Sequence, residues 1–254
     1  MTAGCENYIG RFVEHYFRDL RPDNEKADLL VWASDCPTVS ETAHIERLLD
    51  STGAKAAVML SSCKVYGVKE GLNINESAPA ESDAEAAMAA ACAARNVILT
   101  ILRLPLLVVG TGMGGVLMTM VRQLHRGTYI ESNGEDGTVS VLHSSSVGPA
   151  IEAAAGTPGI FNLTDGSETT VGELADALSY RIGKNRHRPL KPKWAWTLAR
   201  LADRLGISGQ GVEMMEFKTR SLTFSAGKFM STFSFRPVKT TDYLKNHVYD
   251  ENSL

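Results

Sequence analysis

The sequence predicts an α/β fold, in which the strands of a parallel sheet alternate with helices. Short apolar runs that leave no room for helical periodicity are typical of buried strands. Such runs occupy residues 28–33, 56–62 and 97–104. The stretches between them favour helices, as in the segment ending at Gly53, where Ile45, Leu48 and Leu49 fall on one face. The alternation extends to about residue 155, and a mixed tail follows.

Composition and charge limit the classes of function. With 254 residues, 44% of them apolar and 22% charged, the chain resembles an ordinary globular protein. A net charge of -3 argues against nucleic-acid binding, which needs a basic excess. No apolar run approaches the roughly 18 residues of a membrane helix, and the amino terminus lacks a signal-peptide pattern. We therefore expect a cytoplasmic protein with no nucleic-acid and no membrane partner.

The cysteines give no sign of a metal site or a disulfide framework. They lie about thirty residues apart, without the paired spacing that such sites require. They are Cys5, Cys36, Cys63 and Cys92. We expect reduced thiols that act as small buried apolar residues.

The stretch of residues 56–67 carries the clearest functional signal. A buried strand closes on two hydroxyls, Ser61 and Ser62, and ligands of open α/β sheets bind at the carboxyl ends of strands. On residue types alone, a plain serine turn is the simpler interpretation. However, Ser-Ser-x-x-Val-Tyr-Gly, which ends at Tyr66 and Gly67, resembles the serine segment of the extended short-chain dehydrogenase/reductases. This family includes the nucleotide-sugar epimerases and dehydratases, and the resemblance implies that Ser62 is the catalytic serine.

The beginning of the chain is similar to the phosphate loop of the same family, with Gly4, Asn7 and Gly10 in the places of its three glycines. The resemblance implies NAD or NADP as cofactor, contacted by these residues and by Ser61. Asn7 adds bulk where a dinucleotide lies closest. Because only three residues precede Gly4, we expect the strand before the loop to be missing or to start upstream.

The segment after the loop is too short for the family's pattern. Asp28 comes only eighteen residues after Gly10, whereas the family places a second and a third strand there, together with the residue that reads the adenosine ribose. A parallel crossover alone needs about a dozen residues. The sequence therefore predicts that the ribose-reading part is deleted.

The family's Tyr-x-x-x-Lys pair is also absent. In that pair the tyrosine is the acid or base, and the lysine one turn later lowers its pKa. Residues 81–95 stand in this place and favour a helix, but no tyrosine lies between Tyr66 and Tyr129 and no lysine between Lys69 and Lys184. Hydride transfer by the family's mechanism is therefore not expected.

Later segments resemble the substrate-binding part of the family. Residues 97–105 match its Ile-Leu-Arg-x-Pro strand, and the glycines after it match its substrate loop. The resemblance thus implies substrate contacts from Arg103, Gly110, Gly112 and His143. Three alternatives stay open. The glycines up to Gly115 also fit a dinucleotide fingerprint with Glu131 as ribose reader, or a turn that binds no ligand, and a lone histidine is usually structural.

The last hundred residues contain three further features. Thr169 or Thr170 is expected to cap a helix over residues 171–182. Residues 184–193 form a basic run, interpreted as a solvated loop or as a contact for phosphate or an acidic partner. Residues 194–205 have the spacing of an amphipathic helix whose apolar side is expected in the core. That side consists of Trp194, Leu198, Leu201 and Leu205.

Periodicity and resemblance together predict a doubly wound, Rossmann-like parallel sheet, reduced at its amino-terminal end, with a small carboxyl-terminal lobe. We expect a dinucleotide-binding-type domain over residues 1–155 and a smaller substrate-side lobe over residues 156–254. Three functions remain open: a protein that binds a small-molecule ligand such as a nucleotide-sugar without turnover, a non-redox enzyme that uses Ser62 with Tyr66 or His143, and a partner-binding regulatory subunit. A homodimer fits each of them.

Overall fold

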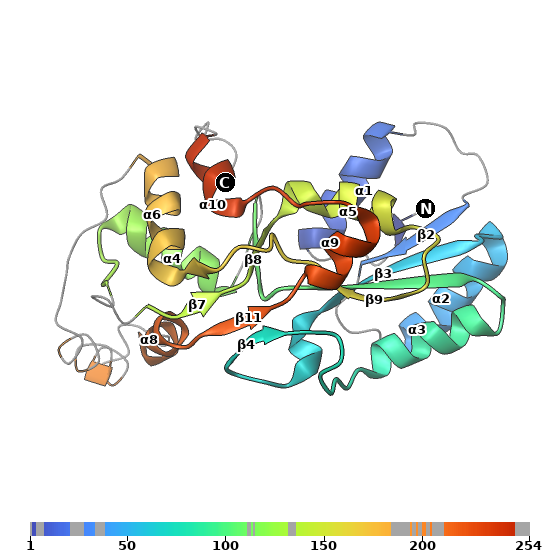
Figure 1. Cartoon of the computed structure of the whole chain (residues 1–254), viewed down its shortest axis with the longest axis horizontal. Coiled ribbons are helices and arrows are strands. Elements are labelled where there is room, and N and C mark those ends of the chain that lie inside the picture. The colour runs from blue at the N-terminus through green and yellow to red at the C-terminus, as the bar shows by residue number, and fades with distance from the viewer. Residues whose placement is uncertain are drawn as a thin grey trace.

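The structure is a computed structural model built around one parallel sheet of five strands, in the order β1-β2-β3-β5-β9 (Figure 1). It describes residues 2–3, 8–20, 28–33, 39–110, 113, 115–131, 136–183, 194, 197, 200–201, 204 and 211–246. The strands are β1 Thr2–Ala3, β2 Leu29–Trp32, β3 Ala56–Ser62, β5 Ile98–Leu104 and β9 Gly159–Asn162. The predicted α/β class and the three predicted strands are confirmed.

Strand β3 lies in the middle of this sheet and includes Ser61 and Ser62. It pairs with β5 along its whole length, from Ala56 opposite Ile98 to Ser62 opposite Leu104. Its apolar residues are buried on both faces, which explains why the sequence shows a continuous apolar run instead of alternation.

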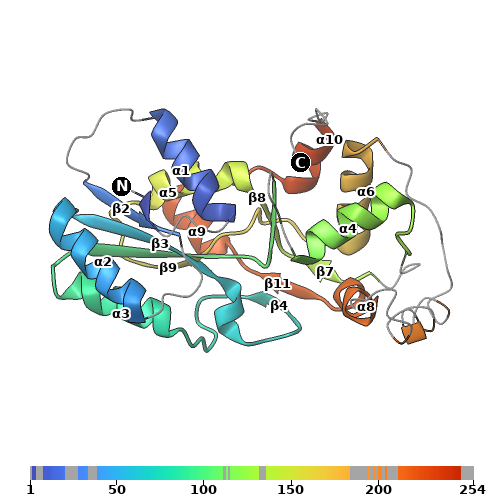
Figure 2. The same ribbon diagram turned by 180° about the vertical axis from the view of Figure 1, so that it is seen from behind.

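Helices cover both faces of the sheet. One face is covered by α1 Tyr8–Leu20, α5 Val147–Ala154 and α9 Gly227–Phe233, and the other by α2 Val39–Thr52 and α3 Asp83–Ala93 (Figure 2). Side chains of β3 alternate accordingly: Val58 and Leu60 pack toward the first group, and Met59 packs toward the second.

The expectation that the first strand is missing is wrong. Thr2 and Ala3 form a short strand, β1, that pairs in parallel with Val31 and Trp32 of β2. Two residues suffice because each finds a partner in the longer neighbour.

The position of β1 nevertheless differs from that in a complete doubly wound sheet. In the usual order 3-2-1-4-5-6, the first strand lies inside the sheet. Here β1 is at the edge, since in the described ranges no strand pairs with its other side. Helix α1 connects β1 to β2, and α2 connects β2 to β3, so both connections step along the sheet in the same direction. Because α1 and α2 cover opposite faces of the sheet, the two crossover connections have opposite handedness.

A second lobe lies beyond the carboxyl ends of β3 and β5 (Figure 1). Its two small sheets have the orders β10-β7-β11-β4 and β6-β8. The strands are β4 Gly71–Ile74, β6 Leu107–Val109, β7 Thr138–Val139, β8 Val141–His143, β10 Thr169–Thr170 and β11 Leu222–Phe224. Because β4 and β7 precede residue 155 and β10 and β11 follow it, the lobe draws on both sides of the expected boundary, which itself stays a prediction.

Among the described residues, the helices of the second lobe include α4 Gly115–Arg126, α6 Val171–Arg181, α8 Gly211–Thr219 and α10 Thr240–Asn246. The expected cap of α6 is present: the Thr170 hydroxyl accepts from the Glu173 amide, while the Glu173 carboxylate accepts from the Thr170 amide. No described helix is long and apolar enough to cross a bilayer.

One expectation about the core is wrong. The apolar side predicted for residues 194–205 is not buried at the two positions described: Trp194 is 64% exposed and Leu201 is 49% exposed. The helical spacing of the apolar residues does not tell whether the apolar side packs into the core of the protein or stays exposed for a partner. The basic run 184–193 lies outside the described residues.

Candidate functional site

A row of polar residues crosses three neighbouring strands at their carboxyl ends. Ser61 of β3 is opposite Arg103 of β5, and Arg103 is opposite Asn162 of β9. Residues in register on parallel strands point to the same face, so the row continues the apolar row formed by Met59, Ile101 and Ile160. The sheet thus changes from apolar to polar at the edge where open α/β folds bind ligands.

Glu85 of α3 joins two members of this row. Its Oε1 accepts a hydrogen bond of 2.6 Å from the Ser61 hydroxyl and one of 3.0 Å from Arg103 Nε, and its Oε2 lies 2.6 Å from Arg103 Nη2. All three residues are at most 7% exposed. The pKa of Arg103 is raised, because the hydrogen bonds to Glu85 and Tyr66 outweigh the larger single effect of burial, which lowers it.

Tyr66 is packed under the same guanidinium. Its ring lies 4.9 Å from Arg103 Cζ and stacks on Phe224, and its hydroxyl donates to Asn162 Oδ1 at 2.7 Å. Burial raises the pKa of the phenol, although Arg103 and Asn162 act in the opposite direction. A 6% exposed phenol with its proton committed to an amide is poorly placed to serve as a catalytic acid or base.

Ser62 shapes the turn that holds Tyr66. Its hydroxyl accepts from the Lys64 amide at 3.2 Å and caps the short 3₁₀ helix Cys63–Tyr66. Gly67 ends that helix at φ +65°, a conformation that favours glycine. The Ser-x-x-Val-Tyr-Gly pattern is therefore explained locally by a cap, a turn and a buried tyrosine.

His143 and Gly110 lie together in the second lobe. Strands β6 and β8 pair with Val109 opposite His143, and Gly110 follows Val109. The His143 ring nitrogen Nδ1 lies 2.7 Å from the Ser145 hydroxyl, and the ring centroid is 3.8 Å from that of Tyr243. With 6% exposure, this histidine has the surroundings of a structural residue.

The predicted site residues thus fall into separate groups. Ser61, Ser62, Tyr66 and Arg103 lie together, whereas His143 and Gly110 form a second group. Gly4, Asn7 and Gly112 lie outside the described residues. The substrate contact expected from Arg103 stays a prediction, and the ion pair with Glu85 argues against it.

Gly10 permits a test of the expected dinucleotide site. It is buried in the first turn of α1, close after β1, as a pyrophosphate site at a helix amino terminus requires. The rest of a dinucleotide site is not matched. Dinucleotides bind in the crevice where the strand order of the sheet reverses, whereas along the described strands the order runs in one direction from β1 to β9. The described residues therefore fit only part of NAD or NADP.

Sequence reasoning missed Glu85 and Asn162. A signal for Glu85 was present, because it shares the helical spacing of the buried Met88 and Cys92, so a carboxylate had to face the core. For Asn162 there was no such signal, since an amide at the end of a strand is common. The predicted burial is confirmed for Cys63 and Cys92, both free thiols; Cys5 and Cys36 are not among the described residues.

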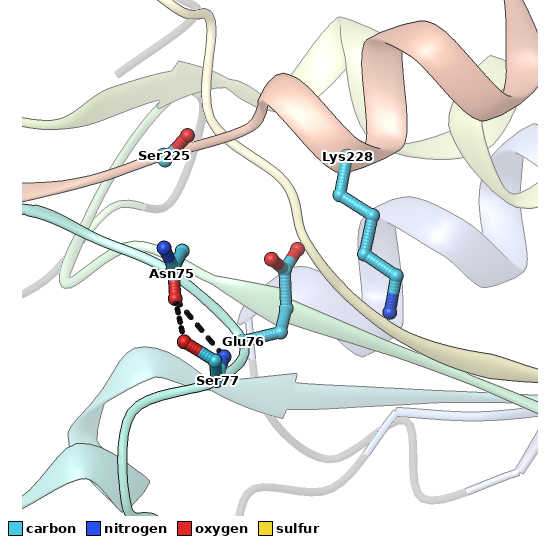
Figure 3. A pocket seen from close by; sticks show the side chains of 5 residues that line it. All are labelled: Asn75, Glu76, Ser77, Ser225 and Lys228. Carbon is cyan, nitrogen blue, oxygen red and sulfur yellow. Dashed lines mark hydrogen bonds between the residues drawn. The ribbon is translucent and has the colours of Figure 1, made fainter.

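A pocket of about 480 Å³ adjoins the row at β9, lined by Asn75, Glu76, Ser77, Ser225 and Lys228 (Figure 3). The two charged side chains of the pocket, Glu76 and Lys228, form hydrogen bonds with the backbone of β9. Glu76 Oε1 accepts from the Asn162 amide at 2.7 Å, and Lys228 Nζ donates to the Ile160 carbonyl at 2.7 Å. These two side chains therefore cover the open edge of the sheet at β9, where unpaired backbone groups would otherwise face solvent.

No family model matches the sequence, and no curated protein matches it. The structure, in contrast, has the fold of the extended short-chain dehydrogenase/reductases and their NAD-dependent epimerases. UDP-N-acetylglucosamine 4-epimerase from Bacillus cereus superposes with a TM-score of 0.65 at 13% identity, over 96% of this chain and 92% of that one. MoeE5 in complex with UDP-glucuronic acid and NAD gives 0.63 at 15%, over 96% and 95%. A UDP-galactose 4-epimerase gives 0.60 at 18%, also over 96% and 95%.

Proposed function

We propose that this chain binds a small ligand of the nucleotide-sugar class and does not carry out hydride transfer. The ligand class is supported by the solved structures that share the fold, which contain UDP-glucuronic acid, UDP-glucose or UDP. Fold alone does not carry chemistry. The second half of the proposal therefore rests on the site itself.

One observation carries the loss of hydride transfer. Helix α3, which stands where the family has Tyr-x-x-x-Lys, directs Glu85 at the end of β3. Glu85 holds the Ser61 hydroxyl and the Arg103 guanidinium in a buried network. A carboxylate in that position stabilises the carboxyl ends of β3 and β5, but it supplies neither a phenol proton nor an ammonium group for a nicotinamide ribose.

The partial dinucleotide site supports the same conclusion. In the described residues no strand pairs with the outer side of β1, so the surface against which the adenosine half of NAD would bind is missing there. We expect the sugar nucleotide to bind more tightly than either NAD or NADP.

Isothermal titration calorimetry with UDP, UDP-glucose, NAD and NADP tests the binding. We expect a saturable signal with UDP-glucose and none with the dinucleotides. Proton NMR of UDP-glucose incubated with the protein and NAD tests the chemistry, and the sugar should stay unchanged. Formation of an epimer would contradict the loss of hydride transfer, whereas absence of any heat with UDP and UDP-glucose would contradict the ligand class.

Matched serine variants localise the ligand. Ser62→Ala changes the partly exposed hydroxyl at the carboxyl end of β3, while Ser51→Ala changes a hydroxyl on α2 that donates to the Leu48 carbonyl. We expect only Ser62→Ala to weaken binding of UDP-glucose.

A further inference from the structure

The described positions between residues 194 and 204 are helical, and they form two stripes. Trp194 and Leu201 are seven residues apart, which places them on nearly the same side of a helix, and both are well exposed. Arg200 and Arg204, four residues apart, are also exposed and follow an adjacent line on that surface. An apolar stripe and a cationic stripe therefore lie side by side in solvent.

This segment also lies in the most basic part of the chain. Residues 184–204 contain seven lysines and arginines and a single aspartate, although the whole chain carries a net charge of -3. All five described positions of this segment are exposed, namely Trp194, Thr197, Arg200, Leu201 and Arg204. Their exposure leaves them accessible to a large flat partner.

We propose that this exposed side binds the surface of an anionic lipid bilayer. An interfacial helix inserts tryptophan and leucine at the level of the headgroups and keeps its arginines against the lipid phosphates. Each basic residue near an anionic surface adds attraction. The expectation of no membrane partner rested on the lack of an apolar span, and association with the surface requires no span.

The charge pattern disfavours a second copy of the chain as the occupant. A two-fold interface places the same patch against itself, which would bring Arg200 and Arg204 of both copies together. Like charges in contact oppose such an interface. A bilayer containing phosphatidylserine has the complementary charge.

Cosedimentation of the full chain with vesicles tests the proposal. We expect the protein to pellet with vesicles of phosphatidylcholine and phosphatidylserine, and to remain in solution with phosphatidylcholine alone. The double substitution Arg200→Gln, Arg204→Gln should weaken binding about thirtyfold. Trp194→Ala with Leu201→Ala should weaken it about tenfold or more, and folding should persist because both side chains are exposed.

Matched substitutions elsewhere serve as controls. Leu72 is 64% exposed, and Lys64 and Lys69 are exposed cations far from this segment in the sequence. Leu72→Ala, and Lys64→Gln with Lys69→Gln, should leave vesicle binding unchanged. Absence of pelleting with anionic vesicles would overturn the proposal, as would unchanged pelleting of the Trp194→Ala, Leu201→Ala protein. A dimer in sedimentation velocity that dissociates in that variant would identify a second copy as the occupant instead.

Discussion

Glu85 and Arg103 form a two-pronged ion pair at the carboxyl end of the central sheet, with 2.6 Å between Oε2 and Nη2 and both side chains almost fully buried. Glu85→Ala leaves the guanidinium buried without a counter-charge. We expect the free energy of unfolding to fall by about 3–5 kcal/mol. Urea denaturation followed by circular dichroism measures this change.

Two variants make this test specific. Glu85→Leu combined with Arg103→Met removes both charges, and it should recover most of the lost stability because no charge then stays buried. Asp50→Asn breaks the exposed pair with Arg95 and should leave stability nearly unchanged. A double variant as unstable as Glu85→Ala would show that the pair matters through shape and not through charge.

Tyr66 should make stability depend on alkaline pH. Because its pKa is raised in the folded protein, the folded state keeps the phenol proton longer than the unfolded state. The stabilisation is therefore complete below the ordinary tyrosine pKa of about 10 and is lost as the pH rises above it.

Tyr66→Phe should cost about 1–3 kcal/mol at neutral pH, since Asn162 Oδ1 loses a buried donor. The difference from the wild type should shrink above about pH 10. Thermal unfolding at several pH values tests this, with the exposed Tyr180→Phe as the control. A constant difference across this range would contradict the assigned environment of Tyr66.

Lys228 and Glu76 should protect the edge of β9. Lys228→Met removes the exposed donor to the Ile160 carbonyl and should cost about 0.5–1 kcal/mol. Since an unblocked edge recruits other strands, we also expect faster aggregation on mild heating, measured by light scattering. Lys69→Met, which changes an exposed lysine, should show neither effect; equal aggregation of both variants would mean that hydrophobicity alone is responsible.

Gly148 fixes the distance between α1 and α5. A Cβ at this position would lie 2.5 Å from a ring carbon of Tyr16. Gly148→Ala should therefore destabilise the protein by about 1–3 kcal/mol, and added Tyr16→Ala should relieve the clash. Gly227→Ala, whose Cβ would meet only the Ser225 hydroxyl at 3.3 Å, is the control for the change in composition. Denaturant midpoints of the four proteins decide the matter.

The sequence was sufficient for the strands β2, β3 and β5 and for the helices α2, α3 and α6, because buried parallel strands and capped helices have local signals. The run ending at Ser62 and the Thr170 cap are examples. It was misleading for β1, since two residues carry no periodicity and the strand exists only through its pairing with β2. It was misleading for Trp194 as well, because exposure depends on what other elements cover.

The candidate site was only half predictable. Ser61 and Arg103 stood out by position and by resemblance, but their connection through Glu85 depends on how α3 packs on the sheet. The link from Tyr66 to Asn162 joins residues 96 positions apart. Contacts at such separation arise from the tertiary arrangement, which motif spacing does not encode.

The edge position of β1 has a consequence for cooperativity. Only two residues of β1 are paired, on one side in the described ranges, and α1 is tied to α5 by the core contact of Val13 and by the bond from the Tyr16 hydroxyl to Glu152. Such a unit opens at lower free energy than the sheet it borders. Amide hydrogen exchange should therefore be fast over β1 and α1 and slow in β3, so that the amino-terminal unit behaves as a separate foldon attached to a stable four-stranded core.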